Sequence, residues 1–236
     1  MPNPTAPIVD DFNRTDTDSI TDDARWTKDP ARNRSGSIFN NALTDLLTPD
    51  WFTVGSFYNM TAFSGNVEVA MTRTDLVDEI AEPDGWDVWT GLYAKMSELS
   101  STGTSDGYAV RLNMNGASTS YTWQLYRVDN GVFTAIGSSA SRTFPRLHEL
   151  FLEAKNDASG TLTVYDNGTQ VIQTTDSTYK AQSGYTGFRF LHQAPWRASP
   201  TPRWGTPYFD NFKAGNPIVA GENRRRHPMR PRMFRP

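Results

Sequence analysis

The sequence predicts an all-β fold in which two antiparallel sheets pack face to face. The chain has 236 residues, and its aromatic share of 12% is enough for a packed core. Thr, Ser, Asn and Gly are plentiful, and they suit strands and turns better than helices. About twelve short strands, separated by frequent turn signals and with no long helix, are typical of a sandwich or a barrel.

The first half of the chain begins with a Pro-rich leader at residues 1–7. Residues 13–37 are polar, and we expect them to form a long loop around Trp26. Residues 76–81 are the best helical candidate, but this segment is short and ends before a proline. Strands are expected at residues 8–12, 51–58, 67–73 and 88–96.

The second half continues the succession of strands. Apolar residues alternate with polar ones in 108–114, as a half-buried strand requires. Asn130-Gly131 and Asn167-Gly168 predict tight hairpin turns, because they tolerate the positive φ angles such turns need. Further strands are expected at residues 121–128, 132–136, 149–154, 161–165, 170–172, 187–191 and 208–212. We therefore expect a single domain over residues 8–214, followed by an extended tail at 215–236.

Several segments together resemble a known family. They are residues 10–12, 107–112, 150–154, 162–168, 175–177, 184–188 and 209–212. They are similar to the concanavalin A-like, or laminin G-like, jelly roll. The resemblance implies two curved sheets, one with a solvent-facing side where glycans often bind. The fold alone fixes no activity, because it also carries hydrolases and virion proteins.

Alternation selects candidate glycan-binding residues on that side. If Val110, Leu112 and Leu125 face the core, their strand neighbours face outward. These outward residues are Arg111, Asn113, Gln124 and Tyr126, which can hydrogen-bond sugar hydroxyls and stack on a sugar ring. Trp89, Trp196 and Trp204 are added as aromatic platforms near loops. The alternatives are an ordinary polar sheet face and tryptophans that only pack.

The sequence does not predict an enzyme. Glucanases of this fold carry three carboxylates on one strand, with Asp between two Glu. The nearest string, Glu79-Ile80-Ala81-Glu82, lacks the middle Asp and the spacing. His148, His192 and His227 have no zinc-ligand spacing. We therefore predict no catalytic residues.

One structural metal site is a candidate. The first and last strands lie side by side in such jelly rolls, so Asp10, Asp11 and Asp210 are expected to approach one another. Their oxygens suit Ca²⁺, and the alternative is that they hydrogen-bond the backbone. The chain has no Cys, so disulfides and thiolate ligands are excluded, and no other cofactor is expected.

Charge is concentrated at the C-terminal end. The net charge is −3, yet residues 224–235 contain six Arg and no acidic residue. An extended basic peptide on an acidic body predicts a docking segment. Its candidate anchors are Arg224, Arg225, Arg226, Arg230, Arg232, Phe234 and Arg235. We expect a protein partner rather than nucleic acid, because the body is acidic; the alternative is a solubilising end.

These features suggest a non-enzymatic phage virion protein, either a minor tail protein or a head decoration. The sequence shows no secretory signal and no apolar run long enough to span a membrane. A protein made in the host cytoplasm and carried on the virion reconciles this with a lectin-like sandwich. The sandwich would bind host-surface glycans, the tail would anchor it, and a homo-oligomer would suit the particle. The alternatives are a glycoside hydrolase and a free-standing carbohydrate-binding module.

Overall fold

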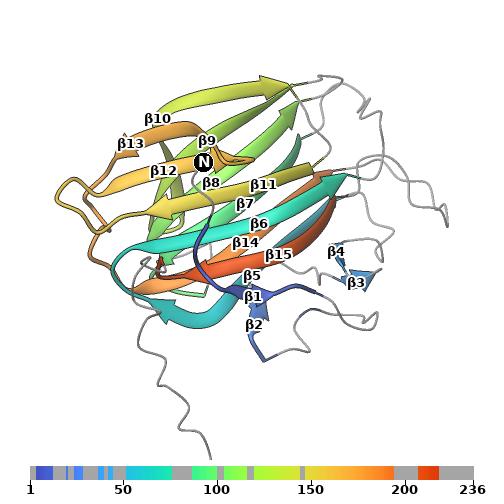
Figure 1. Cartoon of the computed structure of the whole chain (residues 1–236), viewed down its shortest axis with the longest axis horizontal. Helices are drawn as coiled ribbons and strands as arrows, with labels where there is room; N and C mark the ends of the chain where they lie inside the picture. The colour runs from blue at the N-terminus through green and yellow to red at the C-terminus, as the bar shows by residue number, and fades with distance from the viewer. Residues whose placement is uncertain are drawn as a thin grey trace, which may run out of the picture.

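The computed structural model confirms the predicted all-β sandwich. It describes residues 4–12, 20, 24–28, 37–39, 42–44, 52–75, 87–99, 104–115, 120–143, 147–193 and 207–217. Within these ranges the chain forms strands and no α-helix. The strands make two antiparallel sheets, sheet A and sheet B, which lie one behind the other (Figure 1).

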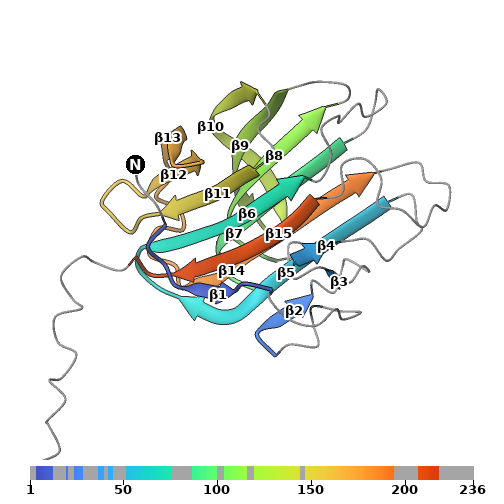
Figure 2. The ribbon, with the colours of Figure 1, turned by 45° about the vertical axis from the view of Figure 1, so that its right-hand side comes forward.

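Sheet A is the nearer layer in Figure 1. Its neighbouring strands follow the order β13 (Thr169–Thr175), β12 (Thr161–Asp166), β11 (Leu147–Ala154), β6 (Val67–Asp75), β15 (Pro207–Gly215), β4 (Ala42–Thr44) and β3 (Ser37–Phe39). The short β1 (Ile8–Asp10) also pairs with β15, as Figure 2 shows. The first and last described strands are thus adjacent, as the family resemblance implies.

Sheet B forms the other layer. Its strands follow the order β10 (Val132–Thr143), β9 (Ser120–Asp129), β8 (Gly107–Asn115), β7 (Asp87–Met96), β14 (Gly184–Gln193), β5 (Phe52–Phe63) and β2 (Trp26–Lys28). Strands β7 to β10 follow one another in the chain, whereas β14 enters from far downstream and lies between β7 and β5. This insertion completes the centre of the sheet.

Two tight turns close the hairpins β9–β10 and β12–β13. Asn130 and Gly131 have φ angles of 48° and 75°, and Asn167 and Gly168 have 47° and 71°. Asn and Gly tolerate this left-handed conformation better than other residues, which is why these dipeptides predicted the turns correctly.

Side chains of alternate residues from both sheets form the core. Its aromatic centre joins Phe12, Trp26, Phe188 and Phe212, with Trp26 ring centroids 5.3 Å from Phe188 and 4.9 Å from Phe212. The expectation that Trp26 sits in a polar loop was wrong. It begins β2, and its indole is buried because these aromatic rings surround it.

Buried polar contacts connect the two sheets. Asp166 on β12 accepts hydrogen bonds from Tyr121 Oη (2.5 Å) and Trp123 Nε1 (3.4 Å) on β9. Arg73 on β6 donates to Thr90 Oγ1 on β7 (3.2 Å). A buried polar group without a partner is costly, so these contacts favour one alignment of the sheets over others.

The described end of the Pro-rich leader is attached to sheet A. Glu68 Oε2 accepts hydrogen bonds from the backbone N–H of Thr5 (2.6 Å) and Ala6 (2.7 Å). Pro7 O accepts one from Ala214 N–H (3.3 Å). Sequence reasoning expected an extended leader but gave no sign of this docking, because it depends on a buried carboxylate from another strand.

Some predictions fall outside the described residues. The candidate helix at 76–81 and the tail residues after 217 belong to this group. The described strands run from Ile8 to Gly215, and the predicted domain boundaries remain predictions. In the part of the chain that is described, no helix is long and apolar enough to cross a membrane.

Replacing Phe188 with Ala should reduce the free energy of unfolding by about 3–5 kcal/mol. Phe188 is fully buried and its ring lies against Phe12, Trp26 and Phe212. Val132→Ala is the control, because Val132 is 64% exposed and its truncation should change stability by less than about 0.5 kcal/mol. Urea unfolding of both variants tests this, and equal losses would contradict the proposed core.

Candidate functional site

The outer face of sheet B, which points away from sheet A, gathers the candidate residues. In β8 and β9 the residues Tyr108, Val110, Leu112, Tyr121, Trp123 and Leu125 point into the core. Their neighbours along each strand therefore point outward. Since paired residues on adjacent strands share a face, the pairing register arranges the outward residues in rows across the sheet.

Three rows define the candidate site. The aromatic row is Tyr58, Gly187, Tyr93, Ala109 and Tyr126. The arginine row is Arg189, Gly91, Arg111 and Gln124. The polar row is Asn113, Thr122 and Ser141. Together they cross β5, β14, β7, β8, β9 and β10.

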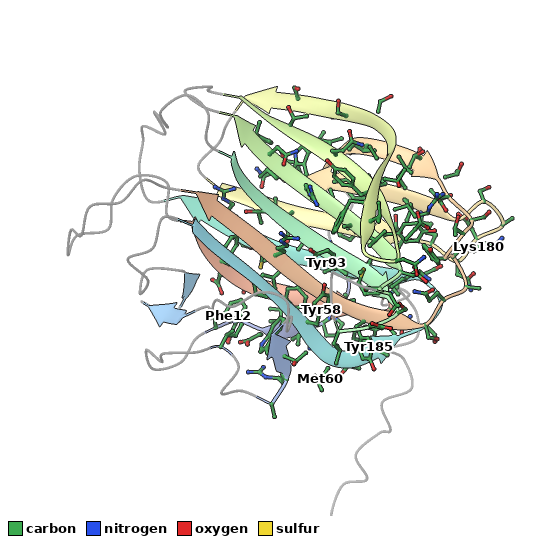
Figure 3. The ribbon with its side chains drawn as sticks, turned by 180° about the vertical axis from the view of Figure 1, so that it is seen from behind. Phe12, Tyr58, Met60, Tyr93, Lys180 and Tyr185 are labelled. Atoms are coloured by element: carbon green, nitrogen blue, oxygen red, sulfur yellow. The ribbon has the colours of Figure 1, made fainter. Side chains whose placement is uncertain are left out.

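The aromatic row is tightly packed. Tyr58 and Tyr93 lie on either side of Gly187, and their rings stack at a centroid distance of 5.4 Å (Figure 3). Phe133 of β10 packs against Tyr93 (6.4 Å) and Tyr126 (5.9 Å). Gly187, which has no side chain, thus lies between the two tyrosines in this row.

Tyr93 carries a buried polar group in this row. The residue is 1% exposed, and its hydroxyl has no hydrogen-bond partner among the described residues. Burying a hydroxyl without a partner costs free energy, so such a group needs a structural or functional explanation.

The arginine row places two positive charges on the same face. The Arg111 guanidinium lies over the rings of Phe133 (4.3 Å from Cζ to centroid) and Tyr126 (4.7 Å). Burial lowers the pKa of Arg111, and the positive charge of nearby Arg189 lowers it further. An arginine remains protonated at neutral pH even so, and both side chains therefore carry charge.

Gln124 has a different role from the one predicted. Its amide Nε2 donates to Leu125 O (2.9 Å) and Ile136 O (3.3 Å), beside the bulge that interrupts the pairing of β9 with β10. In Figure 3, β10 bends strongly over the sheet. The Gln124 amide nitrogen thus supports the bent edge strand, and it is not available to a ligand.

The other predicted binding residues differ in how much the structure shows of them. Arg111, Asn113 and Tyr126 share the outer face with Gln124, as alternation predicted. One face of the Tyr126 ring is covered by Arg111, so that face cannot stack on a sugar. The backbone of Trp89 pairs with Asn113 in the same sheet. Trp196 and Trp204 lie outside the described residues, as do the tail anchors 224–235.

Sequence reasoning missed Arg189, Tyr93, Tyr58 and Phe133. Alternation around Phe188 could have placed Arg189 on a face opposite the core. The sequence gave no sign that β14 lies next to β7, because the two strands are far apart in the chain.

The three carboxylates proposed for calcium do approach one another. Burial raises the pKa of Asp210, and the negative charges of Asp11 and Asp10 raise it further. Asp10, however, accepts hydrogen bonds from Phe12 N–H (2.8 Å) and Trp26 Nε1 (2.7 Å), and Asp210 accepts one from Asn211 N–H (2.7 Å).

The hydrogen bonds from Phe12 and Asn211 match the alternative that the sequence left open, in which the carboxylates bind the backbone, whereas the Trp26 indole is a side-chain donor. Among the residues the structure describes, no group of three or more His, Cys, Asp or Glu side chains could hold a metal ion. The string 79–82 and His227 lie outside these residues, and of His148 and His192 only the backbone is described.

A second polar cluster joins β8 and β9 to the segment after β13. Arg127 Nε donates to both oxygens of Asp129 (3.0 and 2.8 Å), and its NH1 donates to Asp176 (3.1 Å). Tyr179 Oη donates to Asp129 (2.6 Å), and Tyr108 Oη donates to Asp176 O (2.8 Å). Because these groups bind one another, the cluster holds the fold together and offers little to a ligand.

The fold is similar to solved structures of carbohydrate-binding domains. The carbohydrate recognition domain of Emp46p, in a potassium-bound form, has 14% identity and a TM-score of 0.60 over 92% of this chain and 99% of that chain. The carbohydrate-binding module CBM66 from Bacillus subtilis has 12% identity and a TM-score of 0.53, over 80% and 94%. A legume lectin-like domain from Entamoeba histolytica has 9% identity and a TM-score of 0.56, over 82% and 90%.

At these identities the likeness shows the fold, which is a lectin-like, concanavalin A-like sandwich. No protein-family model matches the chain, and no curated protein matches its sequence.

Replacing Tyr108 with Phe should lower the free energy of unfolding at neutral pH. It should also make that free energy decrease less as the pH rises above about 10. The hydroxyl donates to Asp176 O and accepts from Tyr179 N–H (3.0 Å), so its loss should cost about 1–3 kcal/mol. Burial raises the pKa of Tyr108. Both states keep the phenol proton below about pH 10, and above it the unfolded chain loses the proton first. Stability therefore falls as pH rises, and the variant lacks this contribution.

Urea unfolding at pH 7 and at pH 10.5 measures both effects for wild type and variant. The wild type should lose more stability between the two pH values than Tyr108→Phe does. Equal losses would show that this phenol has the same pKa in both states.

Proposed function

We propose that the protein is a non-catalytic carbohydrate-binding module whose site is the outer face of sheet B. The observation that carries this proposal is the convergence of aromatic, cationic and amide or hydroxyl side chains from six neighbouring strands on one face of a lectin-like sandwich. Sugars present hydroxyls and apolar ring faces, so a mixed polar and aromatic surface complements them.

The polar row supplies the hydrogen-bonding part of this surface. Asn113 is half-buried, and its amide can both donate to and accept from a hydroxyl. Thr122 Oγ1 and Ser141 Oγ lie 3.3 Å apart on the adjacent strands. A sugar ring above these residues would meet donors and acceptors on side chains that project from strands rather than from loops.

Carbohydrate-binding relatives of the fold support this choice over an enzyme. Two of the solved structures named above are described as a carbohydrate-binding module and a carbohydrate recognition domain, and the third as a legume lectin-like domain. The described outer-face rows contain no carboxylate to serve as acid or nucleophile. Hydrolysis of any glycan, lost on mutation of a single carboxylate, would contradict the non-catalytic part of the proposal.

Asn113→Ala should weaken glycan binding by about tenfold, because one polar contact to the sugar is lost. The matched control is Gln170→Ala, which removes an amide from an exposed position on β13 of sheet A. A glycan array, followed by calorimetric titration of the best-bound glycan, compares both variants with wild type. Equal binding by Asn113→Ala and wild type would place the site elsewhere.

We also propose that this module is carried on a phage particle and anchored there by residues 222–236. The support is the sequence of the tail, which combines six Arg with Pro, Met and Phe and follows an acidic body. Prolines keep such a peptide extended, and an extended basic segment with apolar anchors suits a groove on an acidic protein partner.

Deleting residues 222–236 should abolish incorporation into particles while glycan binding by the purified protein is unchanged. A second variant replaces the six Arg with Gln, which keeps the length of the tail and removes its charge. Quantitative mass spectrometry of purified particles measures occupancy for each form. Normal occupancy of the truncated protein would overturn the tail-anchor proposal and leave the glycan-binding proposal standing.

A further inference from the structure

We infer that the outer face of sheet B recognises an acidic sugar, whose carboxylate lies between Arg111 and Arg189. This inference rests on the proposed glycan binding and specifies the class of glycan. It is carried by three features of the arginine and aromatic rows, namely the placement of the two cations, the glycine between them and the hydroxyl of Tyr93.

The two arginines occupy matching positions on either side of β7. Arg189 on β14 and Arg111 on β8 both pair with Gly91. Adjacent strands are about 4.8 Å apart, so the two Cα atoms are about 10 Å apart, a span that two arginine side chains can close around a small anion. Arg111 and Arg189 are also the only residues of a charged type in the three rows. Among the described residues, the three rows thus carry two positive charges and no negative one, although the chain as a whole is acidic.

The Arg111 guanidinium is held in a defined orientation. It lies over Phe133 and Tyr126 at 4.3 and 4.7 Å, and both rings belong to the packed part of the face. Arg189 is 6% exposed and is fixed by burial. Ordered guanidinium groups lose little entropy when they bind, and their planar donors match the two oxygens of a carboxylate.

Gly91 differs from Gly187 in what lies beside it. Neither glycine has a positive φ angle, so the backbone does not require glycine at either position. Gly187 adjoins a register irregularity in β14 and lies between Tyr58 and Tyr93, whose rings stack. Gly91 instead separates two cations that repel each other, and Arg189 accordingly lowers the pKa of Arg111. A glycine inside a strand marks a bulge, a tight bend, or a place where a ligand or another backbone approaches closely, and the pairing of Gly91 with Arg111 shows no bulge.

The Tyr93 hydroxyl provides the second, independent observation. It is buried with no hydrogen-bond partner among the described residues, and it lies near enough to Arg111 to contribute to the pKa of that side chain. A carboxylate oxygen entering between the guanidinium groups would accept from this hydroxyl. The adjacent polar row would then lie under the hydroxyl groups of the same sugar.

Binding to carboxylated, methyl-esterified, sulfated and neutral glycans tests the inference. Wild-type protein should bind glycans with uronate units, such as oligogalacturonate, and lose about 10- to 100-fold in affinity when the carboxylates are methyl-esterified. Equal binding to the ester, or binding only to neutral or sulfated glycans, would overturn the inference while leaving glycan binding intact. Binding to no glycan would overturn both proposals.

Two variants locate the effect in the structure. Arg111→Gln should lose about tenfold or more in affinity for the carboxylated glycan, with little change for its methyl ester. Tyr93→Phe removes one oxygen atom that has no partner in the described structure, so it should not lower the melting temperature. It should still weaken binding of the carboxylated glycan severalfold.

Lys155→Gln is the charge-matched control. Lys155 follows β11 of sheet A and lies 3.3 Å from Glu153, away from the outer face of sheet B. The Lys155→Gln variant should bind the carboxylated glycan and its methyl ester with the affinity of the wild type. Unchanged affinity of Arg111→Gln and Tyr93→Phe for the carboxylated glycan would overturn the inference, as would an equal loss in Lys155→Gln.

Discussion

The insertion of β14 between β7 and β5 is the constraint on which the candidate site depends. It brings residues 184–193 into a sheet whose other central strands come from the earlier part of the chain. Phe188 then reaches the aromatic core, while Gly187 and Arg189 on either side of it occupy the outer face. One strand thus stabilises the sandwich with one face and completes the candidate site with the other. Any change in its register by one residue would exchange these roles.

Packing on the outer face follows from the size of the side chains in each row. Large and small residues alternate along the aromatic row, so tyrosine rings can meet over a glycine and lie beside an alanine. This packed layer holds the aromatic rings on which Arg111 rests. The bent β10 contributes Phe133, and the Gln124 amide supports the bulge where β10 departs from regular pairing. The candidate site therefore rests on a packed layer of side chains, which favours recognition without large rearrangement if it binds a ligand as proposed.

Local patterns explain which part of this arrangement the sequence could predict. Alternation in 108–114 and 121–128 placed Arg111, Asn113, Gln124 and Tyr126 on one face, and the pairing of Arg111 with Gln124 confirms it. The pattern could not show that the Gln124 amide binds backbone, because the bulge in β10 arises from tertiary structure. Arg189 and Tyr93 were missed because their proximity to Arg111 depends on a long-range strand pairing. The same limit applies to Trp26, whose burial requires Phe188 and Phe212 from the end of the chain.

Backbone amide chemical shifts, followed by NMR while a uronate oligosaccharide is added, test the central claim most directly. The account predicts that the largest shifts occur at Gly91, Arg111 and Arg189, with smaller ones at Asn113 and Thr122. Amides of β11, β12 and β13 in sheet A should not respond. Shifts centred on sheet A or on the cluster around Arg127 and Asp176, with the arginine row unchanged, would contradict the assignment of the outer face of sheet B as the binding site.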